Sequence, residues 1–484
     1  MDPKIVLGVI LAYFAVLLLI SHFTSRNADN ETYFTGNRRS PWYVVAFGMI
    51  GASLSGITFI SVPGEVGNTH FYYFQLVLGY LAGYFIIATV LLPLYYRLRL
   101  VSIYSWLEER FGKVSHKTGA LIFLTSQSLG ASLRLFVVAG VLQLAFFDHY
   151  HIPFVVTVVL TILMIWAYTY KAGIKTIVWT DTFQTMMMLT SVIVSIILIA
   201  KGLGFSFSGM VQAVVHSEHS KVFNWDWNYG KNFYKQFITG AVVAVAMNGL
   251  DQNEMQKSLT CRNLREAQQN IFLYSLILVV TNLIFLTLGA LLYIFAENKG
   301  IRLPMDEAGH YLNTDRVFPE LALRYLGTGA GIIFLLGIAS AAFSSADSAL
   351  TALTTSFYND FLRTEGKSDR QKRRLRYAVN IAFSLLLITI ILVFRAVNND
   401  SVINTVFAIA GYTYGPLLGL YGFGLITRHS VRDRWVPLVV ILSPLLSWGV
   451  NALLIRSTGF HLGYTILLLN GIITFLGLWI IRKK

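Results

Sequence analysis

One segment in the last third of the chain combines hydroxyl groups and a carboxylate with an apolar setting. The sequence GIASAAFSSADSALTAL covers residues 337–353 and follows the apolar run GIIFLL. Positions i, i+3, i+4 and i+7 share one face of a helix. The polar residues therefore form a stripe: Ser340, Ser344, Asp347, Ser348 and Thr351, with Ser345 beside it. Because hard oxygen ligands suit small hard cations, the stripe predicts a site for a monovalent cation, and Asp181 could add a second carboxylate from another segment.

Two other interpretations of this stripe stay open. Serine and threonine in membrane helices often bond back to the carbonyl four residues earlier and hold neighbouring helices together. Asp347 adds a carboxylate that demands a partner when it is buried. A proton relay through Asp347 is therefore the main functional alternative to a cation site.

A second segment, GMIGASLSGITFISVPGEVG at residues 48–67, is rich in glycine and small residues and contains Pro63. Such a segment unwinds easily in its middle. Unwound backbone frees carbonyl groups that can coordinate cations, and the half-helix ends can face a solute. Close packing of helices through small residues is the alternative explanation.

The composition places both segments in a membrane. Of the 484 residues, 55% are hydrophobic and 13% are charged, with a mean hydropathy of +0.61, whereas soluble domains carry about 25% charged residues. A helix needs about 20 apolar residues to cross the hydrocarbon. That length predicts thirteen spans, at about 4–23, 42–62, 71–96, 118–147, 152–170, 176–200, 236–256, 270–296, 320–358, 376–396, 402–426, 436–455 and 461–481. The 320–358 span is expected to begin with an amphipathic surface helix, PELALRYL.

The first span lacks a basic start and a cleavage site, so we expect it to be retained.

The basic residues predict the orientation of the chain. Most of the 38 Lys and Arg residues fall in alternate connections: 24–41, 97–117, 171–175, 257–265, 359–376, 427–435 and 482–484. Cytoplasmic loops carry this excess, so we expect an outside N-terminus and a cytoplasmic C-terminus in a plasma membrane, in bacteria the cytoplasmic membrane. The net charge of +14 is thus mainly a topology signal, and no nucleic-acid partner is expected.

Six stretches, by their order and spacing along the chain, give it a resemblance to the sodium/solute symporter family, which includes carriers of sugars, proline, sialic acid and monocarboxylates. They are ASLSGITFISVPG (52–64), SIYSWLEERFG (102–112), AGIKTIVWTDTFQ (172–184), LDQNEMQKSLTCRNLREAQ (250–268), SSADSALTALTTSFYNDF (344–361) and GYTYGPLLGLYGFGL (411–425). The resemblance implies an all-α polytopic bundle of about 13 transmembrane helices with two inverted five-helix repeats. It places a leading helix at 4–23, the repeats at 42–200 and 236–426, and two trailing helices at 436–481, all within one transport domain.

The resemblance also implies sodium ligands. The main sodium site of the family matches the carbonyls of Gly51, Leu54 and Ala341 and the hydroxyls of Ser344 and Ser345. A further sodium in some members matches Asp181, Ser344, Ser345, Asp347 and Ser348. Relatives usually carry a small residue where this chain has Asp347, so Asp347 is expected to bind either a second sodium or a proton.

Positions around a solute cavity follow from the same resemblance: Ser53, Ser55, Thr58, Tyr73, Arg134, Asp251, Gln252, Tyr412 and Tyr414. Sialic acid carriers of the family use an arginine on the third core helix, where Arg134 lies about one turn further along. A guanidinium suits bidentate carboxylate binding, although an internal pair of Arg134 with an acid such as Asp181 or Asp347 is the alternative. The lysine that sugar carriers use on the seventh helix is Leu278 here, which weakens a neutral-sugar substrate.

These features together predict a sodium-coupled symporter that imports a small organic solute, with a carboxylate or an acidic sugar favoured. A proton-coupled symporter on the same fold and a membrane sensor that binds solute without transport are the alternatives. The expected partners are Na⁺, the solute and the lipid bilayer, with no required protein partner. No nucleophile–base pair or metal-ligand motif stands out in the sequence, so no enzymatic activity is expected.

Overall fold

The computed structural model describes residues 3–26, 28–227, 229–397, 402–458 and 462–483. Within these ranges the regular elements are helices, and β pairing is limited to three isolated bridges. The all-helical architecture predicted from the sequence is therefore confirmed.

Each predicted span corresponds to one helix or to two consecutive helices, and in the 71–96 span the two helices are joined by a π-helical turn at Ile87–Leu91. The main helices are α1 (Pro3–Thr24), α3 (Trp42–Ser53), α4 (Gly56–Thr69), α5 (Tyr73–Ile86), α6 (Leu92–Arg97), α8 (Lys113–Ala145), α9 (Phe154–Thr169), α10 (Ile174–Gly202), α12 (Phe233–Ala244), α13 (Gln252–Ser258), α14 (Leu264–Asn298), α16 (Thr328–Phe361), α17 (Asp369–Val397), α18 (Val402–Ile426), α19 (Val436–Thr458) and α20 (Ile466–Ile480). The shorter helices are α2 (Asn30–Thr35), α7 (Ser105–Arg110), α11 (Phe207–Val215) and α15 (Val317–Arg324). Residue 461, where the last predicted span begins, lies outside the described residues.

Length and hydropathy support a membrane location for these helices. In the described part of the chain, eight helical stretches are long and apolar enough to cross a membrane, and three shorter helices are also apolar: Trp42–Ser53, Phe154–Thr169 and Ile466–Ile480. The amphipathic segment expected at the start of the 320–358 span forms a separate helix, α15. That span is therefore shorter than predicted and begins with α16 at Thr328.

The first interruption separates α3 from α4 where the glycine-rich sequence predicts it. Leu54 leaves the helical conformation with φ −87° and ψ 77°. Ser55 then adopts an extended conformation and caps α4 through its hydroxyl, which accepts a hydrogen bond from the Thr58 N–H. Such a serine favours a new helix start because it satisfies one of the unpaired N–H groups of the first turn.

The second interruption lies between α12 and α13 and was not predicted. A π-helical turn, Val245–Gly249, ends α12, and Asp251 caps α13 by accepting from the N–H groups of Asn253 and Glu254. The sequence does hold a signal here: a glycine followed by an Asp-x-x-Glu pattern, Asp251 to Glu254, resembles a capping box. The apolar run upstream of it conceals the start of the new helix.

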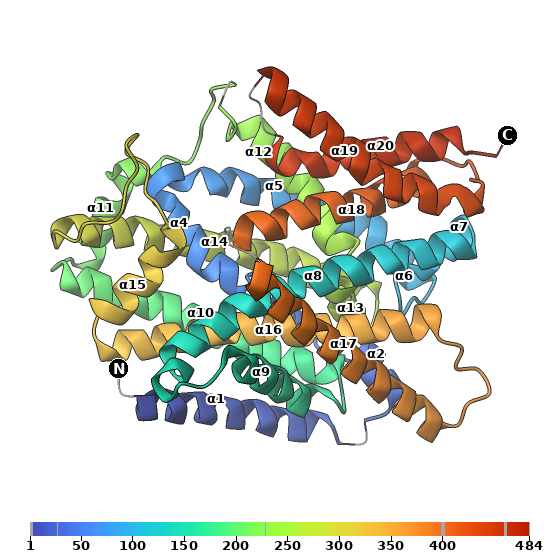
Figure 1. Cartoon of the computed structure of the whole chain (residues 1–484), viewed down its shortest axis with the longest axis horizontal. Coiled ribbons are helices and arrows are strands. Elements are labelled where there is room, and N and C mark those ends of the chain that lie inside the picture. The colour runs from blue at the N-terminus through green and yellow to red at the C-terminus, as the bar shows by residue number, and fades with distance from the viewer. Residues whose placement is uncertain (1–2, 27, 228, 398–401, 459–461, 484) are drawn as a thin grey trace.

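Helix α16 runs through the interior of the bundle and packs against α3, α4, α8 and α10 (Figure 1). Nearly every residue of its second half is buried, including the whole polar stripe. Small residues permit this close packing: a Cβ at Gly337 would collide with Ser191 of α10. At the edges of the view in Figure 1, α1 lies along one side of the bundle and α19 and α20 lie along the other.

Candidate cation sites and solute cavity

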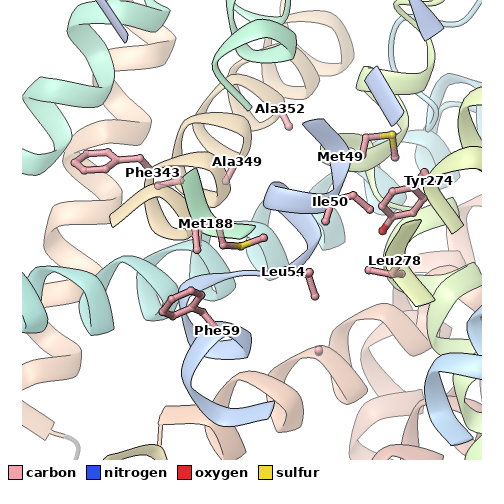
Figure 2. Packing of buried hydrophobic residues seen from close by; sticks show 14 of the residues in the cluster. Met49, Ile50, Leu54, Phe59, Met188, Tyr274, Leu278, Phe343, Ala349 and Ala352 are labelled. Atoms are coloured by element: carbon pink, nitrogen blue, oxygen red, sulfur yellow. The ribbon is translucent and has the colours of Figure 1, made fainter. Parts of the chain in front are cut away.

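Helix α16 meets the interruption of α3 at Ser345. The Ser345 hydroxyl lies 3.2 Å from the carbonyl oxygen of Ala52 and 3.1 Å from that of Ala341, and both distances suit a donated hydrogen bond. Leu54 lies at the interruption itself, with Ile50 before it and Phe59 after it (Figure 2). A serine of α16 therefore reaches a part of α3 where the helical hydrogen-bond ladder ends.

Gly51 brings α3 close to α10 and to the neighbouring serine of α16. Its N–H donates to the Thr185 hydroxyl at 2.9 Å, and a Cβ at this position would lie 3.4 Å from Ser344 Oγ. Of the five residues expected at the main sodium site, Ala341, Ser344 and Ser345 lie on α16 where it contacts α3, and Gly51 and Leu54 lie at the end of α3.

A second polar group surrounds Asp181 of α10. The Ser344 hydroxyl donates to Asp181 Oδ1 at 2.6 Å, and the Ser348 hydroxyl donates to Oδ2 at 3.3 Å. Lys257 of α13 completes the group, with its Nζ 2.8 Å from Asp181 Oδ2. The side chains of both Asp181 and Lys257 are 1% exposed, so this ion pair lies in the interior of the bundle.

Lys257 is the clearest residue that the sequence analysis missed. Its place just after an apolar span assigned it to a basic loop, whereas the structure places it inside α13. The Asp251 cap is again the signal that could have found it. A helix that begins after Asp251 includes Lys257 in its second turn, so Lys257 would have been predicted in a helix and not in a loop.

Asp347 lies next to this group but faces a different neighbour. Its Oδ2 accepts a hydrogen bond of 2.7 Å from the Tyr168 hydroxyl of α9, and its Oδ1 has no hydrogen-bond partner among the described residues. Asp347 and Asp181 act on each other electrostatically, but the serine hydroxyls that bond a carboxylate here bond Asp181. The expected alternative, an ion pair of Asp181 or Asp347 with Arg134, does not form.

Two residues that the sequence did not single out, Tyr274 and Glu254, contact Ser53, which was expected to face the solute. The Ser53 hydroxyl receives a hydrogen bond of 2.7 Å from Tyr274 and lies 3.2 Å from Glu254 Oε2, to which it donates. Glu254 is 5% exposed. Leu278 lies one turn after Tyr274 on α14 (Figure 2), so an apolar side chain lines this face of the helix.

Asp251, Tyr414 and Arg134 form a further group of polar residues. The Tyr414 hydroxyl donates to the Asp251 carboxylate, and Arg134 lies within electrostatic reach of both. Arg134 Nε bonds to the Gly130 carbonyl at 3.0 Å, and Nη2 lies 3.5 Å from Gln127 Oε1. Among the described residues no carboxylate lies within ion-pair distance of Arg134, so its guanidinium retains donors for an added anion.

The remaining candidates have other neighbours. Ser55 and Thr58 contact each other at the start of α4, and Tyr73 lines an apolar pocket with Tyr80 and Gly411. The Gln252 side-chain amide donates to the Val101 carbonyl and accepts from the Ile103 N–H. Both ends of the amide are therefore engaged, which leaves little hydrogen-bonding capacity for a solute. Tyr412 lies on the opposite face of α18 from Tyr414 and approaches Asn451 of α19.

A membrane bundle with two interrupted helices whose ends lie near buried hydroxyls and carboxylates is typical of ion-coupled carriers. The sodium:solute symporter family profile matches residues 33–428. The chain therefore belongs to the sodium:solute symporter family, as the sequence resemblance predicted, and it is a multi-pass membrane protein that transports solute with sodium.

Individual relatives agree with this assignment. The chain is 23% identical over 439 residues to a sodium/sialic acid symporter of Proteus mirabilis, a match that covers 87% of this chain and 85% of that protein. It is 24% identical to sodium-coupled monocarboxylate transporter 2 of Danio rerio, covering 88% of this chain and 68% of that protein. A solved structure of a Na⁺-coupled sialic acid symporter in a substrate-bound, outward-open state superposes with a TM-score of 0.81 over 99% of each chain, at 19% identity. That superposition confirms the fold.

Proposed function

We propose that the chain imports a small organic carboxylate together with sodium, and that the main sodium site comprises the carbonyls of Gly51, Leu54 and Ala341 with the hydroxyls of Ser344 and Ser345. The observation that carries this proposal is the contact of Ser345 with carbonyls on both α16 and α3. A sodium ion among these oxygens would join the two helices. Because such an ion stabilises one arrangement of the helices, it can raise the affinity for a solute that favours the same arrangement.

The second group of oxygens is proposed to affect ion coupling as well. It comprises Asp181 and Ser348, with Ser344 shared between the two groups and Asp347 nearby. Each sodium that enters down a ~100 mV potential contributes about 2.3 kcal/mol. The number of ions bound therefore decides how steep a solute gradient the carrier can sustain.

Arg134 supports a carboxylate as the solute. Its guanidinium is half-buried, is held by neutral groups of its own helix, and has no acidic partner within ion-pair distance among the described residues. Two relatives are named for sialic acid and monocarboxylates, both of which carry a carboxylate. The other groups proposed to face the solute are Ser53, Asp251 and Tyr414.

The charge pattern and the interruptions support the proposed topology. The basic connections on one side support a cytoplasmic C-terminus and an outside N-terminus, in a plasma membrane such as the bacterial cytoplasmic membrane. Residues 42–200 and 236–426 are proposed as the two repeats. The first span of each range is the interrupted one, α3 with α4 and α12 with α13, and inverted repeats are expected to place their discontinuous helices in this way.

Sodium-specific stabilisation tests the ion site directly. A ligand that binds only the folded state raises stability by mass action, so the Tm of the purified protein in detergent should rise with NaCl and not with KCl at constant ionic strength. Ser345→Ala should abolish most of this rise. Ser447→Ala is the matched control, because Ser447 is also buried but bonds only a carbonyl of its own helix. Equal effects of the two salts on the wild-type protein would contradict the proposal.

Uptake of labelled carboxylates into proteoliposomes tests the solute. Sialic acid, pyruvate and a neutral sugar are compared in sodium buffer, and Arg134→Ala should lower carboxylate uptake at least tenfold. Arg324→Ala is the control, because Arg324 is 73% exposed and pairs with Glu320 on α15. Carboxylate uptake at the wild-type rate in Arg134→Ala would remove the basis for this substrate class.

Proton coupling is the second candidate, and one observation favours it: Asp347 Oδ1 has no hydrogen-bond partner among the described residues. A proton on this oxygen would neutralise a buried carboxylate without any cation. Uptake driven by a pH jump in sodium-free buffer, lost in Asp347→Asn, would favour this mechanism over sodium coupling.

A further inference from the structure

Lys257 brings a positive charge of the chain itself to the oxygens that the sequence analysis assigned to a second sodium. Its Nζ lies 2.8 Å from Asp181 Oδ2, the same oxygen that accepts from Ser348. Apart from this ion pair, its ammonium has no hydrogen-bond partner among the described residues. Among the described residues, Asp181 is thus the one carboxylate within ion-pair distance of a lysine whose side chain is 1% exposed.

We propose that Lys257 is a tethered cation that competes with sodium for Asp181, so that the second cation position holds either the ammonium or an ion. This inference rests on the proposed function, because it assumes that sodium binds between α3, α10 and α16. It goes beyond that function by assigning Lys257 the role of setting how tightly, and hence whether, a second sodium binds.

Sodium and the Lys257 ammonium cannot occupy the second cation position at the same time, because both would contact the same oxygen atoms. A sodium ion in contact with Asp181 Oδ2 and Ser348 Oγ would lie against the same oxygen atoms that the Lys257 ammonium now approaches. Two unshielded positive charges in contact with one carboxylate oxygen repel strongly in a buried site. Sodium can therefore bind here only when Lys257 moves away.

The position of Lys257 also gives this exchange a consequence for transport. The ion pair joins α13 to α10, and the serines on α16 join the same carboxylate. When no ion is present, the ammonium keeps Asp181 from being a buried charge without a partner, which would be costly inside a membrane protein. The carrier therefore keeps a counter-charge at Asp181 during the step of the transport cycle in which it changes conformation without bound sodium.

Equilibrium binding of radioactive sodium to the detergent-purified full chain tests this proposal without knowledge of the solute. The wild-type protein should show a tighter site that Ser345→Ala weakens and a weaker site that Asp181→Asn removes. In Lys257→Gln the weaker site should bind sodium at least tenfold more tightly, because its competitor is gone. The double variant Lys257→Gln with Asp181→Asn should lose that gain.

Lys257→Arg is the variant that keeps the charge, and its weaker site should stay at least as weak as in the wild-type protein. If Lys257→Gln does not fold, Lys257→Met is measured in its place. Sodium affinity at the weaker site should then be higher in Lys257→Met than in the wild type and Lys257→Arg. Unchanged affinity at the weaker site upon loss of the lysine charge would overturn the proposal. Failure of the proposed function gives a different result, namely no sodium-specific binding at either site of the wild-type protein.

Discussion

Removal of the charges of Asp181 and Lys257, singly and together, should reveal how the interior of the bundle is neutralised. Breaking a buried ion pair by removing one partner costs about 3–5 kcal/mol of stability, because the other charge stays buried. Glu254 and Asp347 also act electrostatically on the Lys257 ammonium. Lys257→Gln therefore leaves three carboxylates without a cation, whereas Asp181→Asn leaves the ammonium with two carboxylates in reach.

This asymmetry fixes the expected order of the free energies of unfolding. The expected destabilisation is about 5 kcal/mol for Lys257→Gln and about 3 kcal/mol for Asp181→Asn, the two ends of the range for breaking a buried ion pair. The double variant removes both charges and should cost much less than the sum of about 8 kcal/mol. A coupling energy of at least ~2 kcal/mol is expected, as for residues in one ion-pair network.

Unfolding of the four proteins in mixed detergent micelles, followed by the loss of helical circular dichroism, measures these energies. The exposed pair of Arg324 and Glu320, whose side chains are 73% and 39% exposed, supplies the matched cycle on α15. Its variants should change stability by no more than about 1 kcal/mol. Additive single effects at Asp181 and Lys257, or a larger cost for Asp181→Asn than for Lys257→Gln, would refute the reasoning.

Three further substitutions probe single contacts. Gly51→Ala places a Cβ 2.5 Å from Thr185 Oγ1, so we expect a loss of about 1–3 kcal/mol in stability and weaker sodium-dependent stabilisation in the Tm assay. Tyr414→Phe removes the hydroxyl donor of buried Asp251 and should cost about 1–3 kcal/mol, together with slower uptake in proteoliposomes; wild-type values for both would contradict that role. Asp347→Asn removes a negative charge near the second cation position and should weaken sodium binding there about tenfold in the radioactive-sodium assay, whereas unchanged affinity would leave Asp347 to proton binding alone.

The first interruption and the polar stripe could be predicted from sequence because both depend on local rules. Glycine and small residues around Leu54, followed by the capping Ser55, indicate a helix that ends and restarts. A period of 3.6 residues likewise brings Ser344 and Ser348 to one face of α16, where both bond Asp181. The spans could also be located from local sequence, because a helix that crosses the hydrocarbon needs about 20 consecutive apolar residues.

The partners of the charged residues could not be predicted, because they depend on how distant helices pack. Lys257 and Asp181 are far apart in sequence and come from helices whose contact no local pattern encodes. Asp347 shares the polar stripe with Ser344 and Ser348, yet it bonds Tyr168 of α9, because α16 is surrounded by helices on all sides. A stripe on a buried helix fixes which residues neighbour one another but not which helix each residue faces.

The adjacent residues Ser344 and Ser345 explain how two ion positions can influence each other. Consecutive residues of an α-helix point about 100° apart, so Ser345 bonds the carbonyl of Ala52 on α3 while Ser344 bonds Asp181 on α10. Any rotation or shift of α16 that improves one contact must move the other by a similar amount, because both serines belong to the same rigid turn. In the proposed scheme, an ion at the end of α3 would therefore alter the oxygens around Asp181. The ammonium of Lys257 would oppose that change while it holds Asp181 and permit it once it has moved away. This coupling needs no contact between the two ions, because α16 presents Ser345 to the end of α3 and shares Ser344 between the two positions.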